Sequence, residues 1–346
     1  MSDIPVVSLT TAASMLSLIA ADMHRPFYLH GPSGVGKSEI VAQVCAALGG
    51  TLVDIRLSQY ESVDMRGIPD VQAGSTVWNP PATMPFKGNV KFEMCDPSKP
   101  IFLFFDEANS GEPSVMAVMY QITNDRRCGE HELLDNVVII LAGNRAEDRG
   151  VTNRLPAPLA NRATHVDIVP DIAAWSTWAT KAGLPIPLIG FLNFRSGLLH
   201  TFDPAKPATV FATPRSWGFV AKIMARTDLP DDVRQATING TVGEGPGVEL
   251  GAFMDIMDKI RPIEEIIKDP ENVPFEKELD IQWAMATHVA GHMTKQTADQ
   301  LHKFLARLEP EMVVMAWTLA INRDEDITDT NAFLHGYSQH YRSLFV

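Results

Sequence analysis

The sequence has few cysteines and lacks long apolar runs. Only three of its 346 residues are cysteines, and none forms a C-x-x-C pair, which excludes a disulfide-stabilised scaffold and favours a reducing compartment. The longest apolar runs are too short to span a bilayer, and the first 24 residues contain no Lys or Arg to form the basic start of a signal peptide. We therefore predict a cytoplasmic protein without a membrane span.

Charge of both signs is present but unevenly distributed. Hydrophobic residues make up 45% of the sequence and charged residues 21%, which excludes disordered and collagen-like chains and is typical of a globular protein of about two domains. The net charge is −13; residues 228–280 carry 14 acidic and 5 basic residues, whereas residues 169–227 carry 2 acidic and 6 basic ones. The confined acidic segment indicates either a partner surface or an ordinary solvated surface.

Short apolar segments alternate with helical ones in the first half of the chain. Five segments predict strands of one parallel sheet, at residues 26–30, 51–57, 101–105, 137–142 and 164–169. Apolar residues at helical spacing predict helices at 38–48 and from residue 113. After residue 170 the pattern predicts helices only, at 175–181, 214–226, 250–267 and 282–308. An α/β domain followed by helical ones is therefore expected.

A glycine-rich motif follows the first predicted strand. Residues 31–38 match G-x-x-x-x-G-K-[ST] and lead directly into a predicted helix. Glycines in such a loop let backbone N–H groups point at phosphate oxygens, and the helix N-terminus adds partial positive charge. We expect Lys37 to contact the β- and γ-phosphates and Ser38 to bind Mg²⁺. The predicted nucleotide-binding residues are Gly31, Pro32, Ser33, Gly34, Val35, Gly36, Lys37, Ser38 and Asp106.

Polar residues follow two further predicted strands. Asp106 and Glu107 come after the apolar run at 101–105, at the carboxyl end of a parallel strand, where open α/β sheets bind ligands. We expect Asp106 to complete the Mg²⁺ site and Glu107 to orient and deprotonate the attacking water. Asn144 follows the strand at 137–142 and could hydrogen-bond the γ-phosphate or the water, although Gly-Asn is also a common turn dipeptide.

The order of these motifs resembles that of the AAA+ ATPases, in which the strand-end asparagine is called sensor 1. Several segments resemble the MoxR branch in particular. They are 64–69 (DMRGIP), followed by an insert near 78–84; 126–133 (RRCGEHEL), which resembles a pre-sensor hairpin; 153–156 (NRLP) with 161–162 (NR); and 213–216 (TPRS), which resembles sensor 2. The resemblance covers residues 26–226 and implies ATP and Mg²⁺ as cofactors.

The resemblance also implies a domain division and two further catalytic arginines. The expected domains are an αβα AAA+ core with a five-stranded parallel sheet at 1–168, a helical lid at 169–268 and a helical C-terminal extension at 269–346, which the resemblance does not explain. A guanidinium supplied across a subunit interface stabilises charge on the γ-phosphate. We assign this role to Arg162, with Arg154 and Arg149 as rivals, and expect Arg215 to sense nucleotide. An arginine that acts in trans requires a ring, which in this family is a hexamer.

The leading interpretation is a Mg²⁺-dependent ATPase of the MoxR type that remodels or activates a protein partner. Such rings often work as chaperones with a protein that has a von Willebrand factor A domain, so we expect a partner of this kind. The alternative is a nucleic-acid motor or loader, in which Arg126, Arg127 and His131 contact phosphates. The chain has no dense cluster of Lys and Arg and a pI of about 5.2, so we favour the protein partner.

Overall fold

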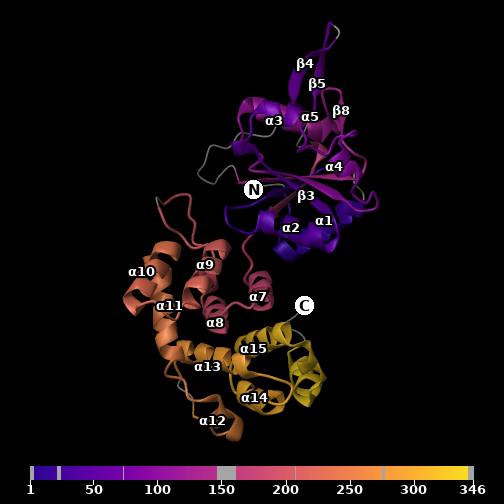
Figure 1. The fold of residues 1–346 in the computed structure, drawn as a ribbon. Helices are drawn as coiled ribbons and strands as arrows, with labels where there is room; N and C mark the ends of the chain where they lie inside the picture. The colour runs from indigo at the N-terminus through magenta and orange to yellow at the C-terminus, as the bar shows by residue number, and fades with distance from the viewer. Residues whose placement is uncertain are drawn as a thin grey trace. The chain divides into compact units, whose positions relative to one another are not determined.

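The computed structural model describes residues 4–21, 25–72, 74–145, 161–206, 208–274 and 277–341. The chain divides into two compact units, Met1–Val169 and Pro170–Val346. The first contains a parallel sheet with helices on both faces, and the regular elements described in the second are helices (Figure 1).

Six parallel strands form the sheet of the first unit, in the order β1-β10-β2-β9-β6-β3. The strands are β1 (Val6–Val7), β2 (Phe27–His30), β3 (Thr51–Arg56), β6 (Ile101–Asp106), β9 (Val137–Gly143) and β10 (Thr164–Ile168). All five predicted strands are present, which confirms the α/β core. The sheet has one strand more than predicted, because the two residues of β1 are too few to give a pattern; they pair with the edge of β10.

Each face of this sheet has its own hydrophobic core. Successive residues of a strand point to opposite faces, so in β6 Phe102 and Phe104 enter one core and the residue between them, Leu103, enters the other. The helices are α1 (Leu9–Ala21) and α2 (Lys37–Ala47) on the first face, and α3 (Ser62–Arg66) and α5 (Pro113–Asp125) on the second (Figure 1). Burial on both faces holds β6, and therefore Asp106 at its end, in a fixed position.

Two antiparallel hairpins accompany the sheet. Strand β4 (Ile68–Gln72) pairs with β5 (Ser75–Asn79), and β7 (Arg127–Cys128) pairs with β8 (His131–Glu132). The first hairpin projects from the side of the unit where α3 and α5 lie, and a short helix, α4 (Val90–Glu93), follows it (Figure 1). Between α3 and β4, Gly67 has a φ of 90°, and a side chain there would meet the carbonyl oxygen of Asn79. Glycine is therefore needed where the chain turns from the helix into the hairpin.

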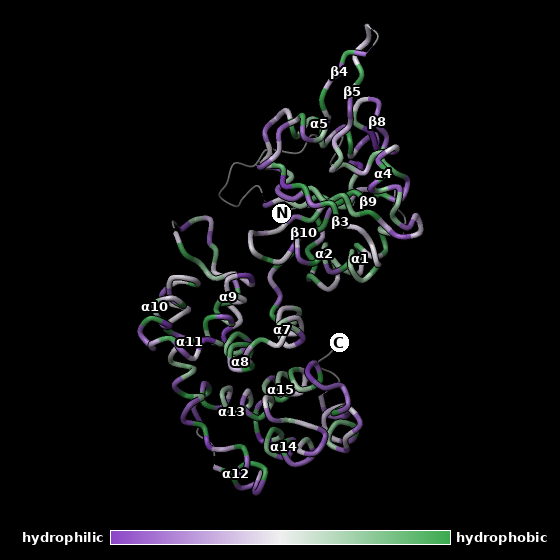
Figure 2. The backbone as a smooth tube through the Cα atoms, in the orientation of Figure 1, coloured by the Kyte–Doolittle hydropathy of each residue, from purple (hydrophilic) through white to green (hydrophobic). Residues whose placement is uncertain are grey.

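The second unit contains helices around one hydrophobic core. They are α7 (Ile172–Lys181), α8 (Ile186–Phe194), α9 (Pro214–Met224), α10 (Asp231–Val242), α11 (Glu244–Met257), α12 (Ile263–Lys268), α13 (Leu279–His292), α14 (Ala298–Leu305), α15 (Pro310–Arg323), a π-helix (Ala332–Tyr337) and α16 (Ser338–His340), with short 3-10 turns at Ser196–Leu198 and Glu325–Asp329. Figure 2 shows the green of apolar residues along α8, as it does along the strands of the first unit.

Two long predicted helices of this unit are each divided. The segment 250–267 is the end of α11 followed by α12, and the segment 282–308 contains most of α13 and all of α14. Pro262 immediately precedes α12, and a proline has no N–H with which to continue a helix. One cluster of buried side chains extends from Trp175 to Tyr337. The division of this half of the chain into a lid and an extension stays a prediction.

Among the described residues, no helix has both the length and the hydrophobicity needed to cross a bilayer. The cytoplasmic location stays a prediction.

Candidate active site

The loop between β2 and α2 depends on glycine for its backbone. Gly31, Gly34 and Gly36 have φ values of 149°, 77° and 107°, where other residues are strained. A Cβ atom at Gly31 would also lie 2.7 Å from the carbonyl oxygen of Ile168 in β10. The loop leads into the N-terminus of α2, where unpaired N–H groups and the helix dipole favour an anion.

Lys37, the first residue of α2, is only 8% exposed despite its charge. Its Nζ donates hydrogen bonds to the carbonyl oxygens of Gly31 (2.6 Å) and Pro32 (2.9 Å) and to Oδ1 of Asn144 (3.3 Å). A buried ammonium group is costly unless oxygens or an anion compensate it. The lysine therefore joins the loop to the end of β9 and keeps a positive charge where a phosphate group fits.

Ser38 and Asp106 bring together oxygen ligands of the kind that Mg²⁺ prefers. Ser38 Oγ donates a hydrogen bond of 2.8 Å to Oδ2 of Asp106, so the first turn of α2 contacts the end of β6. The other carboxylate oxygen of Asp106 accepts a hydrogen bond from the backbone N–H of Glu107 at 2.9 Å. Protein sites for Mg²⁺ usually supply one or two such groups and leave the remaining positions to water and substrate phosphates. The pair fits a Mg²⁺ ion bound together with a nucleotide.

Glu107 has a backbone conformation that few residues of its type adopt. Its φ is 54°, in the left-handed region, and strain of this kind is concentrated at functional sites. Its Oε2 accepts a hydrogen bond from the hydroxyl of Ser58, in the 3-10 turn Leu57–Gln59 that follows β3. Ser58 was not among the predicted site residues. The signal that could have found it is the strand register, which places Arg56 beside Asp106, so the residues after β3 and β6 lie close together.

Asn144 directly follows β9 and is held by a second asparagine. The side-chain amide of Asn109 donates a hydrogen bond of 2.8 Å to the carbonyl oxygen of Asn144. The preceding residue, Gly143, is enclosed, because a Cβ atom there would lie 2.3 Å from the hydroxyl oxygen of Tyr28. The structure thus brings the predicted residues Lys37 and Asn144 together and adds Asn109 as their neighbour.

Two histidines lie beside the start of the loop. His30, at the end of β2, and His165 in β10 share a hydrogen bond of 2.8 Å between Nε2 and Nδ1. Burial, and then the nearby charges of His165, Lys37 and Arg145, lower the pKa of His30 from 6.5 to about 3. His30 is therefore neutral at physiological pH. It adds no positive charge next to the ammonium group of Lys37.

The predicted arginines fall in different parts of the chain. Arg162 is exposed; its guanidinium donates to the carbonyl oxygen of Asn124 at 3.3 Å and lies 3.8 Å from a carboxylate oxygen of Asp125, both at the end of α5. Arg215 is an exposed residue in the first turn of α9, in the second unit. Arg149 and Arg154 lie outside the described residues. The catalytic roles of all four stay predictions.

The comparisons with known proteins identify the segment that holds this site. Residues 26–163 match the family model of the AAA domain, dynein-related subfamily. These residues form an AAA domain. An AAA domain is an ATPase domain, and the chain is an ATPase. All predicted site residues except Arg215 lie within the matched segment.

Beyond the AAA domain, the likeness to known proteins is weak. Similar solved structures include NtrX from Brucella abortus in complex with ADP (16% identity, 98% of this chain and 68% of that chain, TM-score 0.37). Others are a RuvB mutant from Thermotoga maritima (13%, 87% and 85%, 0.37) and PCH-2 from C. elegans (14%, 92% and 68%, 0.31). The comparison with curated proteins found no match.

Proposed function

We propose that this chain couples Mg²⁺-dependent ATP hydrolysis to the remodelling or activation of a protein partner, as a MoxR-type chaperone ring. One observation carries the catalytic part of the proposal. The hydrogen bond of 2.8 Å between Ser38 and Asp106 joins the first turn of α2, which follows the glycine-rich loop, to the last residue of β6, directly before Glu107. Groups suited to phosphate, to Mg²⁺ and to a water molecule therefore meet at one edge of the sheet.

The residues at this edge divide the chemistry among them. The loop N–H groups and Lys37 would bind the β- and γ-phosphates, and Ser38 and Asp106 would hold the Mg²⁺ ion. A bound Mg²⁺ ion neutralises charge that develops on the phosphate oxygens. Glu107, held by Ser58, orients the attacking water and accepts its proton. Asn144 donates its side-chain N–H to the γ-phosphate or to that water.

The second part of the mechanism requires a neighbouring subunit. Arg162 is exposed, as an arginine that acts on the site of another subunit must be. A guanidinium in that position contributes up to about 10³–10⁵ in rate in other nucleotide hydrolases. We therefore propose a ring, a hexamer by resemblance to the MoxR branch, in which Arg162 acts in trans and Arg215 senses the nucleotide.

A mixing experiment tests the ring and the arginine together. Glu107→Gln and Arg162→Ala are each expected to hydrolyse ATP poorly. When the two variants assemble together, an interface with the Glu107 of one subunit and the Arg162 of the other is intact, so activity should partly return. A wild-type chain that is fully active as a monomer would contradict the ring. If the mixed assembly forms but stays inactive, Arg162 is not the trans residue, and the same mixing with Arg154→Ala tests its rival.

The partner is proposed on charge and on resemblance. We propose a protein with a von Willebrand factor A domain, bound by the acidic segment 228–280 and the residues that follow it. Replacing the exposed acids Asp255, Asp258 and Glu264 with Asn or Gln in the full chain should weaken this binding, and a pull-down with the candidate partner measures it. An unchanged ATPase rate and melting temperature of the variant are the controls for folding. Equal partner binding by the variant and the wild type would place the partner surface elsewhere.

A nucleic-acid motor is the second candidate, favoured by one observation. The side chain of Arg127 is exposed on the β7–β8 hairpin, where its Nε donates a hydrogen bond of 2.8 Å to the carbonyl oxygen of Gly129. Binding of fluorescent DNA at several salt concentrations tests this candidate. Affinity that falls steeply with salt would support phosphate contacts, and a slope near zero would remove it.

A further inference from the structure

Two rigid elements connect the β7–β8 hairpin to the proposed catalytic residues. Helix α5 begins at Pro113, shortly after Glu107, and ends where the hairpin begins; β9 begins after the hairpin and ends directly before Asn144. Their 13 and 7 residues give lengths of about 20 Å and about 23 Å. The hairpin therefore lies at the far end of two elements: α5 connects it to Glu107, and β9 connects it to Asn144.

These connections are tied together at the nucleotide end. Asn109, in the loop between Glu107 and α5, donates its side-chain N–H to the carbonyl oxygen of Asn144 at 2.8 Å. Asn109 is buried, with 6% of its surface exposed. The loop that carries Glu107 and the residue that ends the β9 connection thus share a buried hydrogen bond.

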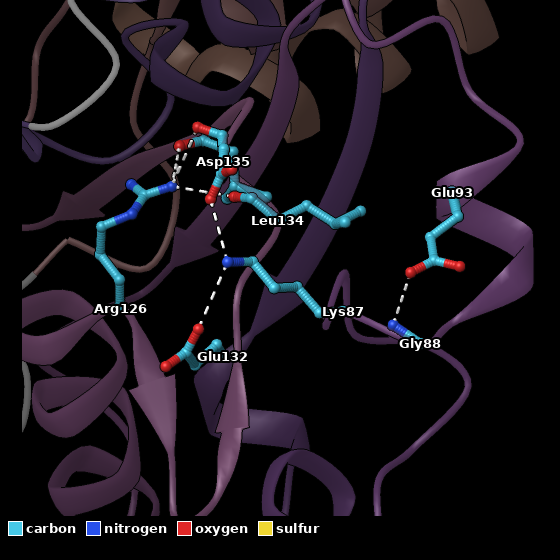
Figure 3. Close-up of polar contacts among 8 residues, drawn as sticks. Lys87, Gly88, Glu93, Arg126, Glu132, Leu134 and Asp135 are labelled. Atoms are coloured by element: carbon cyan, nitrogen blue, oxygen red, sulfur yellow. Dashed lines mark hydrogen bonds and ion pairs between the residues drawn. The ribbon is translucent and has the colours of Figure 1, made fainter.

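Arg126 ties the connections together at the hairpin end. It follows the last residue of α5, and its Nη2 donates hydrogen bonds to the carbonyl oxygens of Leu134 (3.0 Å) and, at a longer distance, Asp135 (3.4 Å) (Figure 3). The same Nη2 donates to the carbonyl oxygen of Val137 at 2.9 Å. The carbonyl oxygen of Arg126 accepts the N–H of Leu133 at 2.8 Å. Arg126 thus links the C-terminus of α5 to the residues just before β9 and to the first residue of β9.

Arg126 has a backbone conformation that is unfavourable for a residue with a side chain. Its φ is 52°, in the left-handed region where glycine or asparagine is usual at the end of a helix. An arginine there accepts an unfavourable backbone conformation. A planar guanidinium can reach several carbonyl oxygens at once, whereas a lysine ammonium on a flexible stem is a single point charge.

Lys87, in the chain segment between β5 and α4, provides a natural comparison because it also contacts this hairpin. Its Nζ lies 3.3 Å from Glu132 and 3.2 Å from Asp135 (Figure 3), but the three side chains are 48%, 58% and 91% exposed. Exposed ion pairs of this kind contribute little to stability. Arg126 is half-buried and bonds to backbone atoms, so its contacts fix the chain more firmly.

We propose that Arg126 is a positioning residue that makes the β7–β8 hairpin, Glu107 and Asn144 move as one body. The proposal rests on the proposed function, because it assigns Glu107 and Asn144 to catalysis. In this arrangement, α5 and β9 cannot slide past each other, because Arg126 closes the frame at one end and Asn109 closes it at the other. A change at the hairpin is then transmitted to the water-orienting carboxylate and to the phosphate contact together.

Four variants test this role in the full-length chain. Arg126→Ala removes the guanidinium, and Arg126→Gly removes it while relieving the left-handed backbone, so that the second variant keeps the test valid if the first is unstable. Arg126→Lys keeps a donor, and Lys87→Ala removes an exposed cation near the same backbone. We expect kcat for ATP to fall about tenfold in the Ala and Gly variants, with KM within about twofold of the wild type. Arg126→Lys should be intermediate, and Lys87→Ala should match the wild type.

Two outcomes would contradict the positioning role of Arg126. If Arg126→Gly folds with the wild-type melting temperature and keeps kcat within about twofold, Arg126 has only a local structural role. A common loss of kcat in all four variants, Lys87→Ala included, would also overturn it, because the effect would then not depend on the guanidinium. Absence of ATP binding by the wild-type chain would instead show failure of the proposed function.

Hydrogen exchange measures the coupling without turnover. In the wild type, a nonhydrolysable ATP analogue should slow exchange in the hairpin peptide that covers residues 131–137, although the nucleotide binds at the opposite end of β9. In Arg126→Gly this nucleotide-dependent difference should disappear, while protection of the loop at 31–38 is retained. A hairpin in the wild type that does not respond to the analogue, or one that responds equally in the variant, would contradict the proposal.

Discussion

Residues at the sheet edge of the AAA domain are arranged for chemistry, whereas residues in the core of the second unit are arranged for stability. At the sheet edge, Lys37 is buried among oxygen atoms and Glu107 has a φ of 54°. Both arrangements lower the free energy of unfolding, but they place charged groups at the site. In the second unit, Trp317 is 0% exposed, stacks on Tyr337 at 5.1 Å and donates its indole N–H to His302 at 3.2 Å. Changes at the edge should therefore alter chemistry at little cost in stability, and changes in the core should do the reverse.

The largest effect is expected at Glu107. Glu107→Gln keeps the shape of the side chain but removes the proton acceptor, so we expect kcat to fall about 10²–10⁴-fold. Affinity for ATP and the melting temperature should stay close to those of the wild type, because the loop and Lys37 are unchanged. Phosphate release and equilibrium binding measure the two properties. Near-normal turnover would end the assignment of Glu107 as general base.

The opposite pattern is expected at Trp317. Trp317→Ala removes a fully buried ring and leaves a cavity, which typically lowers the free energy of unfolding by about 3–5 kcal/mol. Chemical denaturation followed by circular dichroism measures it. Trp178→Ala is the matched control, because Trp178 is 36% exposed on α7 and should cost far less. ATP affinity of the folded Trp317→Ala variant should change little; a large loss would show that the two units are not independent in this respect.

A pH-dependent contribution to stability is expected from the sheet edge. The pKa of His30 is lowered from 6.5 to about 3, first by burial and then by His165, Lys37 and Arg145. Between these values the unfolded chain binds more protons than the folded one, so the free energy of unfolding falls as the pH decreases from about 6.5 toward 3. The slope from one such group is at most about 1.4 kcal/mol per pH unit.

Replacing the histidine isolates this contribution. His30→Asn cannot take up a proton, so urea unfolding of the variant at pH 7, 6 and 5 should depend less on pH than that of the wild type. His335→Asn, at an exposed histidine of the second unit, is the control. An unchanged slope in His30→Asn would show that His30 does not contribute.

The strands and the phosphate loop were predictable because their signals are local. Residues 31–38 follow an apolar run and precede a helix in the sequence, so the motif and its setting are read together. Asp106 could be placed because five apolar residues predict the buried strand before it. The two residues of β1 and the helix α1, whose Thr10, Thr11 and Ser14 are weak helix formers, gave no comparable signal.

Other features depend on residues that are distant in sequence. Ser58 meets Glu107 only because β3 pairs with β6 in the register that sets Arg56 beside Asp106. Arg126 donates to backbone carbonyl oxygens, which every residue has. Residue types therefore do not show which carbonyl groups the tertiary fold brings close to it. Sequence could name the groups that carry charge at the site, but it could not show which neighbours hold them.

The smallest expected effect concerns one of these neighbours, Ser58. Its hydroxyl donates to Glu107, and Ser58→Ala removes this restraint on the carboxylate that we propose to orient the attacking water. Since Glu107 itself remains, we expect kcat to fall only about two- to fivefold, with KM and stability unchanged. Ser58→Thr keeps the hydroxyl and should retain most of the activity. A rise in kcat would mean that Ser58 holds Glu107 away from the water, and the sheet edge would then contain a restraint on catalysis instead of a support for it.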